Sequence, residues 1–283
     1  MGKVLRTLAF HQQISLTVAD TTQIVREAIK LHHLTPLSAR ILGKALSAMT
    51  FASACLKQEI GEISLSVLTQ GECGNLGVSG NRQLRLRGYI ENPFLLGEPN
   101  KGNEQEAFQN GTLTIIRDDG YNRPFVGSCA VPELGGVDEA FEEYFRISEQ
   151  LPTRVATEVE IDENGDCVFA GVIALQALPF ADEAALRSAA EMRLDEALQA
   201  VKAGGVEKAS EVFFPDKTVW EIREAAYKCN CSREYLKGVL VTLGEAELRR
   251  IIQEDGAVRV HCHYCNADYE FTEDDANELF ANK

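Results

Sequence analysis

The segment Arg259–Asp268 reads RVHCHYCNAD. Within five consecutive positions it carries four side chains that can bind a metal ion: His261, Cys262, His263 and Cys265. A second segment, Lys228–Ser232, reads KCNCS and supplies two more thiols, with thirty residues between the two cysteine pairs. Because these potential ligands gather near the end of the sequence, they decide how the C-terminal region folds.

The two pairs of thiols, Cys229 with Cys231 and Cys262 with Cys265, suit a tetrahedral zinc site in which each pair forms one edge. The residues between the pairs predict two helices that end at glycine, and AVRVHC leads into CNADYEF as a β-hairpin. A turn at CHYC brings its two sulfurs toward the other pair. The sequence therefore predicts one zinc ion per chain, held by four thiolates.

The two histidines compete poorly with the thiols for the metal. Side chains alternate along a strand, so His261 faces away from Cys262, and His263 lies in the turn between the thiols and points outward. Four cysteines already complete the coordination shell. We expect both histidines to be exposed or to support the ligands, with a site of three cysteines and one histidine as the alternative.

A closed four-thiolate site has no open position for water or substrate, so hydrolytic zinc chemistry is not expected. A domain of fewer than about 60 residues builds little core of its own. Structural zinc contributes about 10–16 kcal/mol to the folding of such modules. Oxidation of the thiolates to disulfides ejects the metal and unfolds the module, so the site is both a staple and a redox trigger.

The net charge and the hydropathy pattern of the chain argue against several classes of partner. The net charge of -15 argues against a nucleic-acid partner, which normally meets a basic face. No apolar run reaches the length of a membrane span and no signal-peptide pattern is present, so we expect a cytoplasmic protein with reduced thiols and no membrane association. The scattered thiols are interpreted as small buried hydrophobes: Cys55, Cys73, Cys129 and Cys167.

Strand and helix signals mix in unequal blocks before Pro179. A strand is predicted over 8–20, helices over 20–33 and 35–56, and mainly alternating strands between 62 and 178. Because no βαβ rhythm appears, the fold class is predicted to be α+β, with a largely antiparallel sheet and packed helices. The glycine-rich stretch GECGNLGVSG lacks the Lys-Ser/Thr ending of a phosphate loop and predicts turns.

After Pro179 the sequence becomes rich in alanine and charge. Helices are predicted over 181–205, 206–213 and 217–227, each with a thin apolar face. Helix stability comes mainly from packing such a face, so we expect a marginally stable segment that docks on its neighbours. The chain thus divides into three predicted parts: a core domain 1–179, a helical linker 180–226 and a zinc-binding redox-switch domain 227–283.

The segment 229–271, from CNCSREYL to CNADYEF, resembles the zinc-binding module of a bacterial family of redox-regulated heat-shock chaperones, the 33 kDa chaperonins. RGYIENP, YFRISEQLPT and GVIALQALP are similar to further landmarks of this family, so the resemblance spans nearly the whole chain. GECGNLGVSG departs from the more compact Gly-Pro turn that the family usually has there. The histidines beside Cys262 are also atypical.

The resemblance implies a holdase, an ATP-independent chaperone without enzymatic activity. In the reduced family member, zinc on four thiolates keeps the C-terminal module folded and the linker docked. Peroxide with heat, or hypochlorous acid, forms two disulfides and releases zinc; here these join Cys229 to Cys231 and Cys262 to Cys265. The module and linker then lose structure and expose apolar surface that binds unfolding proteins, usually as a homodimer.

Two other functions are weighed against this one. A constitutive zinc module could dock a protein or nucleic acid through Arg249, Arg250 and Arg259, although acids outnumber bases in this region. A thiol oxidoreductase could use CHYC, but such enzymes present a reactive thiol at a helix N-terminus, whereas this motif follows a predicted strand.

Overall fold

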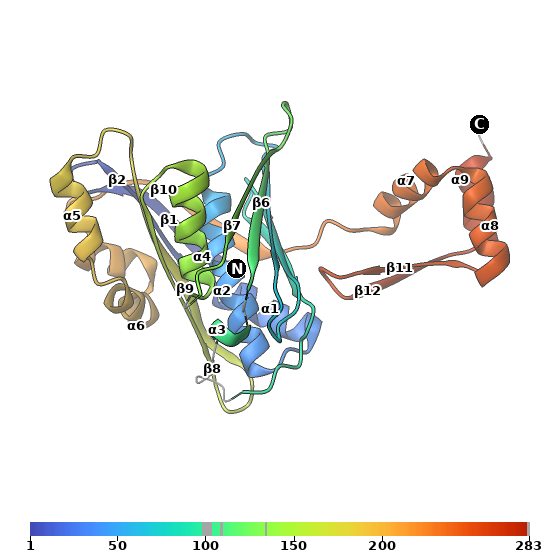
Figure 1. The fold of residues 1–283 in the computed structure, drawn as a ribbon, viewed down its shortest axis with the longest axis horizontal. Coiled ribbons are helices and arrows are strands. Elements are labelled where there is room, and N and C mark those ends of the chain that lie inside the picture. Colours follow the sequence, from blue (N-terminus) through green and yellow to red (C-terminus); the bar gives the residue numbers. More distant parts are fainter. Residues whose placement is uncertain (98–103, 108–109, 134, 282–283) are drawn as a thin grey trace. The chain divides into compact units, whose positions relative to one another are not determined.

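The computed structural model describes residues 1–97, 104–107, 110–133 and 135–281. The chain forms two compact units, unit 1 from Met1 to Lys228 and unit 2 from Cys229 to Lys283 (Figure 1). Within the described residues, no helix is both long enough and apolar enough to cross a membrane. Each unit has its own hydrophobic core, described in turn below.

Unit 1 is built on a single ten-stranded sheet in the order β7-β6-β3-β4-β5-β10-β1-β2-β9-β8. Neighbouring strands pair antiparallel throughout, except that β10 and β5 are parallel. This mixed architecture confirms the predicted α+β class. The strands are β1 (Gly2–Ala9), β2 (Ile14–Asp20), β3 (Glu62–Leu68), β4 (Leu76–Asn81), β5 (Arg85–Ile90), β6 (Thr112–Asp118), β7 (Phe125–Ala130), β8 (Thr153–Ile161), β9 (Cys167–Ala177) and β10 (Thr218–Tyr227).

Helix α2 (Pro36–Ala54) lies at the centre of unit 1. It contacts β4 and β5 from one part of the sheet and β8 and β9 from the other (Figure 1). Nearly every residue of α2 is buried, which is typical of a helix that is apolar all round. The remaining helices of this core are α1 (Thr22–His32), the short α3 (Glu104–Ala107), and α4 (Val137–Tyr144), which continues as the π-helical turn η1 (Phe145–Glu149).

A second core lies on the other face of β1, β2 and β9, where α5 (Glu183–Glu191) and α6 (Leu194–Phe213) pack. Alternation along β1 separates the two cores, since Val4 belongs to the first and Leu5 to the second. Leu16, Val18 and Ile173 are fully buried in this second core. The segment after Pro179 is therefore docked on the sheet in this structure, whereas its marginal stability stays a prediction.

Three sequence-based expectations about individual elements are wrong. The helix expected over 181–205 is interrupted at Met192, whose backbone is extended, so that α5 and α6 form in its place. The helix expected over 217–227 is strand β10, which pairs with β1 along its length and meets β5 only at Ala226 and Tyr227. Thr218, Val219 and Ile222 favour a strand, and the open edge of β1 outweighs the helix propensity of the following Arg-Glu-Ala-Ala run. The single strand expected over 8–20 is a hairpin, because three consecutive residues after Ala9 have positive φ angles of 52° to 65° and turn the chain.

Unit 2 contains a two-stranded sheet and three helices among its described residues. Strands β11 (Val258–Cys262) and β12 (Ala267–Phe271) form the expected antiparallel hairpin. The two helices expected before it are α7 (Arg233–Leu243) and α8 (Glu245–Asp255), and α9 (Glu273–Phe280) follows. The core of unit 2 is small: Leu240, Leu248, Ile252, Val258, Phe271, Ala276 and Phe280.

A carboxyl group in the first turn of α4 connects this helix to β8. Asp138 accepts hydrogen bonds from the Thr157 backbone N–H (2.9 Å) and from the Thr157 hydroxyl (2.6 Å). Burial raises the pKa of Asp138 from 3.8 to about 6, although Lys44 and the two hydrogen bonds act in the opposite direction. Between these two pH values the folded chain therefore binds more protons at this site than the unfolded chain.

We expect the substitution Asp138→Asn to change how the stability of unit 1 depends on pH. As pH rises from about 4 to about 6, ionisation of the buried wild-type carboxyl lowers the free energy of unfolding of unit 1. The loss is at most about 3 kcal/mol for a shift of about two pKa units, and it stays constant at higher pH. The variant should thus compare more favourably with the wild type at pH 7 than at pH 4. Urea unfolding of both proteins at the two pH values measures this difference, and parallel pH profiles would contradict it.

Candidate metal centre

Two arms of unit 2 carry the four predicted ligands. The CNC arm holds Cys229 and Cys231 just before α7, and the CHYC arm holds Cys262 at the end of β11 and Cys265 in the hairpin turn. All four thiols are half-buried and none forms a disulfide. The structure gathers their sulfur atoms within 4.8 Å of one another, and this is the group of potential ligands that its described residues bring together.

The spacing of the sulfurs fits a tetrahedral zinc ion. Zinc–sulfur bonds of about 2.3 Å place the corners of the tetrahedron about 3.8 Å apart. Across the two arms, the Sγ atoms of Cys229 and Cys262 are 3.7 Å apart, and those of Cys231 and Cys265 are 3.2 Å apart. Four thiol donors also match the ligand type that structural zinc prefers. The identity of the ion stays a prediction.

The turn of the CHYC arm is fixed by the backbone. The carbonyl of Cys262 accepts hydrogen bonds from the N–H of Cys265 (3.3 Å) and of Asn266 (2.8 Å). Asn266 adopts a left-handed conformation (φ 57°), which asparagine tolerates better than most residues. This turn aims both sulfurs of the arm at the same point. On the other arm, the Cys231 N–H lies 3.5 Å from the sulfur of Cys229.

The thiols of the cluster differ in acidity. Burial opposes ionisation of Cys231, but hydrogen bonds from Tyr269 and from the neighbouring thiols outweigh it and lower the Cys231 pKa to about 7. The Tyr269 hydroxyl lies 3.3 Å from the Cys231 sulfur and can donate to the thiolate. Burial raises the pKa of Cys229 to about 11 and raises that of Cys265 further. Of Cys229, Cys231 and Cys265, Cys231 therefore loses its proton at the lowest pH.

The two histidines of the hairpin lie outside the sulfur cluster. Both are exposed, and their rings meet edge to face with centroids 5.2 Å apart. His261 Nδ1 lies 2.8 Å from a carboxylate oxygen of Asp268 on the paired strand. This places His261 away from Cys262, as strand alternation requires.

The four cysteines of unit 1 have the properties of inert thiols. Cys73, Cys129 and Cys167 are buried. Burial raises their pKa values to about 12, about 11 and about 12, and it also raises the pKa of Cys55. Thiols that stay protonated at neutral pH react slowly with oxidants. These pKa values contrast with the lowered pKa of Cys231 in unit 2.

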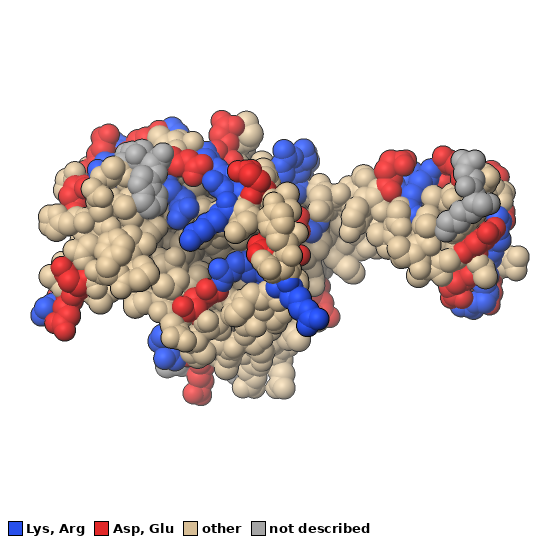
Figure 2. Space-filling view, turned by 90° about the horizontal axis from the view of Figure 1, so that it is seen from above, with Lys and Arg blue, Asp and Glu red and all other residues tan. Residues whose placement is uncertain are grey.

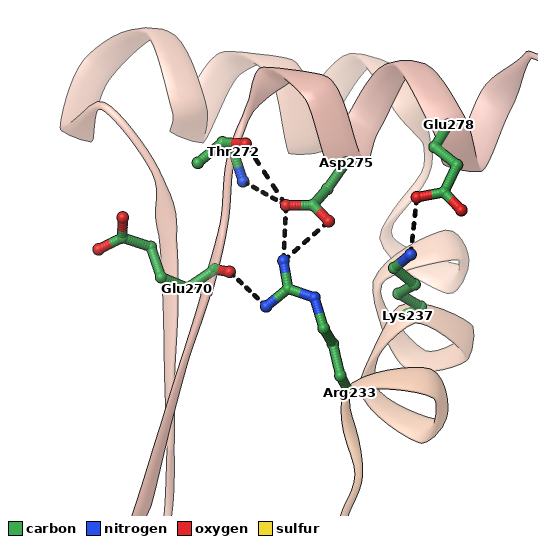
Figure 3. Close-up of polar contacts among 6 residues, drawn as sticks. All are labelled: Arg233, Lys237, Glu270, Thr272, Asp275 and Glu278. Carbon is green, nitrogen blue, oxygen red and sulfur yellow. Dashed lines mark hydrogen bonds and ion pairs between the residues drawn. The ribbon is translucent and has the colours of Figure 1, made fainter.

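Residues that the sequence patterns did not single out join the two arms. The guanidinium of Arg233, two positions after Cys231, donates to the backbone carbonyl of Glu270 (2.8 Å) and to both carboxylate oxygens of Asp275 (2.8 Å each) (Figure 3). It also lies over the ring of Phe271, 4.6 Å from the centroid. Its place directly after Ser232, the N-cap of α7, suggested only an ordinary helix start.

The chain is similar in sequence and in structure to proteins of one known family. Residues 2–272 match the family model described as Hsp33 protein. A 33 kDa chaperonin of Clostridium perfringens (strain SM101 / Type A) is 34% identical over 99% of this chain and 92% of its own length. One from Clostridium botulinum (strain Eklund 17B / Type B) is 31% identical over 99% and 98%. The crystal structure of the 33 kDa chaperonin (heat shock protein 33 homolog) from Thermotoga maritima superposes with a TM-score of 0.83 at 26% identity, covering 98% of this chain and 97% of that one.

Proposed function

The chain belongs to the Hsp33 family of 33 kDa chaperonins and is thus a chaperone, and we propose that it acts as a redox-regulated, ATP-independent holdase. The observation that carries this proposal is the cluster of four sulfurs within 4.8 Å in a unit with a small core. Under reducing conditions Cys229, Cys231, Cys262 and Cys265 hold zinc, which supplies the cross-link that such a unit needs to stay folded.

Oxidation reverses this arrangement. Two peroxide molecules oxidise the four thiolates to two disulfides, Cys229–Cys231 and Cys262–Cys265, within the two arms. Each peroxide takes up two electrons and two protons and becomes two water molecules. The disulfide sulfurs no longer carry the negative charge that binds the metal, so the ion leaves and the link between the arms is lost.

Loss of structure in unit 2 then extends to the predicted linker, 180–226. Cys229 follows Tyr227, the last residue of β10, by two positions. If the linker detaches, the apolar face of β1, β2 and β9 beneath α5 and α6 becomes available, including Leu16, Val18 and Ile173. Unfolding proteins expose similar apolar surface and would bind there by the hydrophobic effect. The oxidised chaperone is proposed to act as a homodimer in the cytoplasm.

The decisive test compares the reduced and oxidised protein on one client. We expect the reduced, zinc-loaded protein to leave aggregation of a thermally unfolding client nearly unchanged, as measured by light scattering. After peroxide treatment it should suppress aggregation at stoichiometric amounts. In parallel, bound zinc should fall from one per chain to none, and free thiols from eight to about four as two disulfides form. Equal suppression in both states would exclude the redox switch.

The competing hypothesis is a zinc module that binds nucleic acid constitutively, and the arginines of unit 2 give it little support. Arg250 pairs with Glu247 and Glu254, and Arg259 pairs with Glu270. Arg249 is likewise engaged by two glutamates. On the visible face of each unit, acidic and basic side chains are intermixed (Figure 2). Phosphate binding would have to break these ion pairs, and its test is salt-sensitive binding of an oligonucleotide by the reduced protein.

A further inference from the structure

Arg233 connects the elements that follow the two arms of the candidate zinc site, through contacts that involve no sulfur atom. It starts α7, immediately after the CNC arm, and reaches Glu270 at the end of β12 and Asp275 in α9 (Figure 3). Glu270 lies on the strand that follows the CHYC arm. One side chain therefore joins the helix that follows the CNC arm to the strand and helix that follow the CHYC arm.

The partner of Arg233 is itself held in place. Asp275 accepts a hydrogen bond from the Thr272 backbone N–H (2.9 Å) and so forms the capping box of α9. Its side chain is 14% exposed, and the Arg233 side chain is 44% exposed. An arginine paired with a fixed carboxylate and stacked on an aromatic ring loses less freedom than a surface ion pair. We refer to Arg233, Glu270, Phe271 and Asp275 as the arginine clamp.

A second ion pair joins the same two helices but lacks these features. Lys237 in α7 lies 2.8 Å from Glu278 in α9; the Lys237 side chain is 14% exposed and the Glu278 side chain 70% exposed. The lysine stacks on no aromatic ring in the described part of the unit, and an ion pair whose carboxylate lies mostly in solvent contributes little to stability. Lys237–Glu278 is therefore a matched control for the clamp, because it has the same charges and connects the same elements.

We propose that Arg233 is a positioning residue of the zinc site, which aligns the CNC arm with the CHYC arm and thereby sets the affinity for zinc. This inference rests on the zinc site of the proposed function and adds a determinant of its regulation. Metal binding is coupled to the folding of unit 2, so every contact that favours the closed arrangement of the arms strengthens metal binding. Partners that orient metal ligands typically contribute a factor of about 10–100 to affinity. Without the clamp, the ion leaves sooner and less oxidant is needed to open the unit.

The experiment measures zinc affinity in the full-length reduced protein by competition with a chromophoric chelator. Arg233→Gln should raise the Kd for zinc by about 10–100-fold, whereas Lys237→Gln should leave it within about twofold of wild type. Arg233→Lys keeps the charge but loses the two-pronged geometry and the stacking, so its Kd should fall between the two. Equal Kd values for Arg233→Gln and Lys237→Gln would overturn the proposal.

Two further measurements separate positioning from general loss of structure. Hydrogen exchange at saturating zinc should show wild-type protection of α8 in Arg233→Gln; if this variant does not fold, Arg233→Lys takes its place and must bind at least about fivefold more weakly than wild type. In a double-mutant cycle, adding Asp275→Asn to Arg233→Gln should cost little further affinity, because the two residues act together. Full additivity would contradict the clamp. Since no chaperone assay is involved, these results stand or fall independently of holdase activity.

Discussion

Chelation of zinc from the reduced protein is expected to unfold unit 2 and to leave residues 1–179 of unit 1 folded. The seven residues that form the core cluster of unit 2 are too few to balance the conformational entropy of this part of the chain. Zinc bound by four thiolates contributes about 10–16 kcal/mol in comparable modules, more than all other contacts of such a unit together. Within unit 1, strands β1–β9 and the core around α2 stay folded, because none of them involves the four clustered sulfurs.

Hydrogen exchange with and without chelator measures this effect for each unit separately. Amides of β11, β12 and α8 should lose their protection when zinc is removed, whereas those of β2 and β9 should keep it. Cys262→Ser should reproduce the loss without chelator, because it removes one of the four ligands. Cys55→Ser, which changes a thiol of unit 1, serves as the control and should retain zinc. Persistent protection of unit 2 in the absence of zinc would show that the metal is not needed to keep this unit folded.

The site was largely predictable because its signal is local. Cys229 with Cys231, and Cys262 with Cys265, are close in sequence, and each pair specifies one edge of a tetrahedron whatever the surrounding fold. The hairpin follows from the alternation in AVRVHC and the turn after it. Assembly of the two pairs needed only that the intervening helices form, and their glycine ends mark them clearly.

What the sequence did not reveal depends on contacts between distant residues. Arg233 and Asp275 are 42 positions apart, and no sequence motif around either residue indicates that it contacts the other. Tyr269 reaches Cys231 across 38 positions. Strand β10 was missed for the same reason, because its partner β1 lies at the opposite end of the unit 1 sequence. A central position in the sheet, between β1 and β5, overrides the local preference of this segment for a helix. Local patterns specify elements and ligands, whereas pairing at long range decides which elements meet.

Phe271→Ala is expected to open unit 2 at a lower concentration of zinc chelator than the wild type needs, without any oxidant. Phe271 is fully buried at the centre of the unit's core and also carries the guanidinium of Arg233 on its ring. Truncation of a buried phenylalanine costs about 3–5 kcal/mol, which is comparable with everything that such a small unit derives from its core. Tyr235→Ala is the matched control, because this aromatic side chain of α7 is 60% exposed and its loss leaves no cavity.

If opening of unit 2 is the activating event, the reduced Phe271→Ala protein should suppress client aggregation at a chelator concentration that leaves the wild type inactive, with all eight thiols still free. Light scattering, thiol titration and hydrogen exchange on the same sample relate opening to activity. Suppression by Tyr235→Ala should stay at the level of the reduced wild type. An open unit 2 without suppression would separate unfolding from activation and would mean that disulfide formation itself, acting beyond the loss of structure, creates the surface that binds clients.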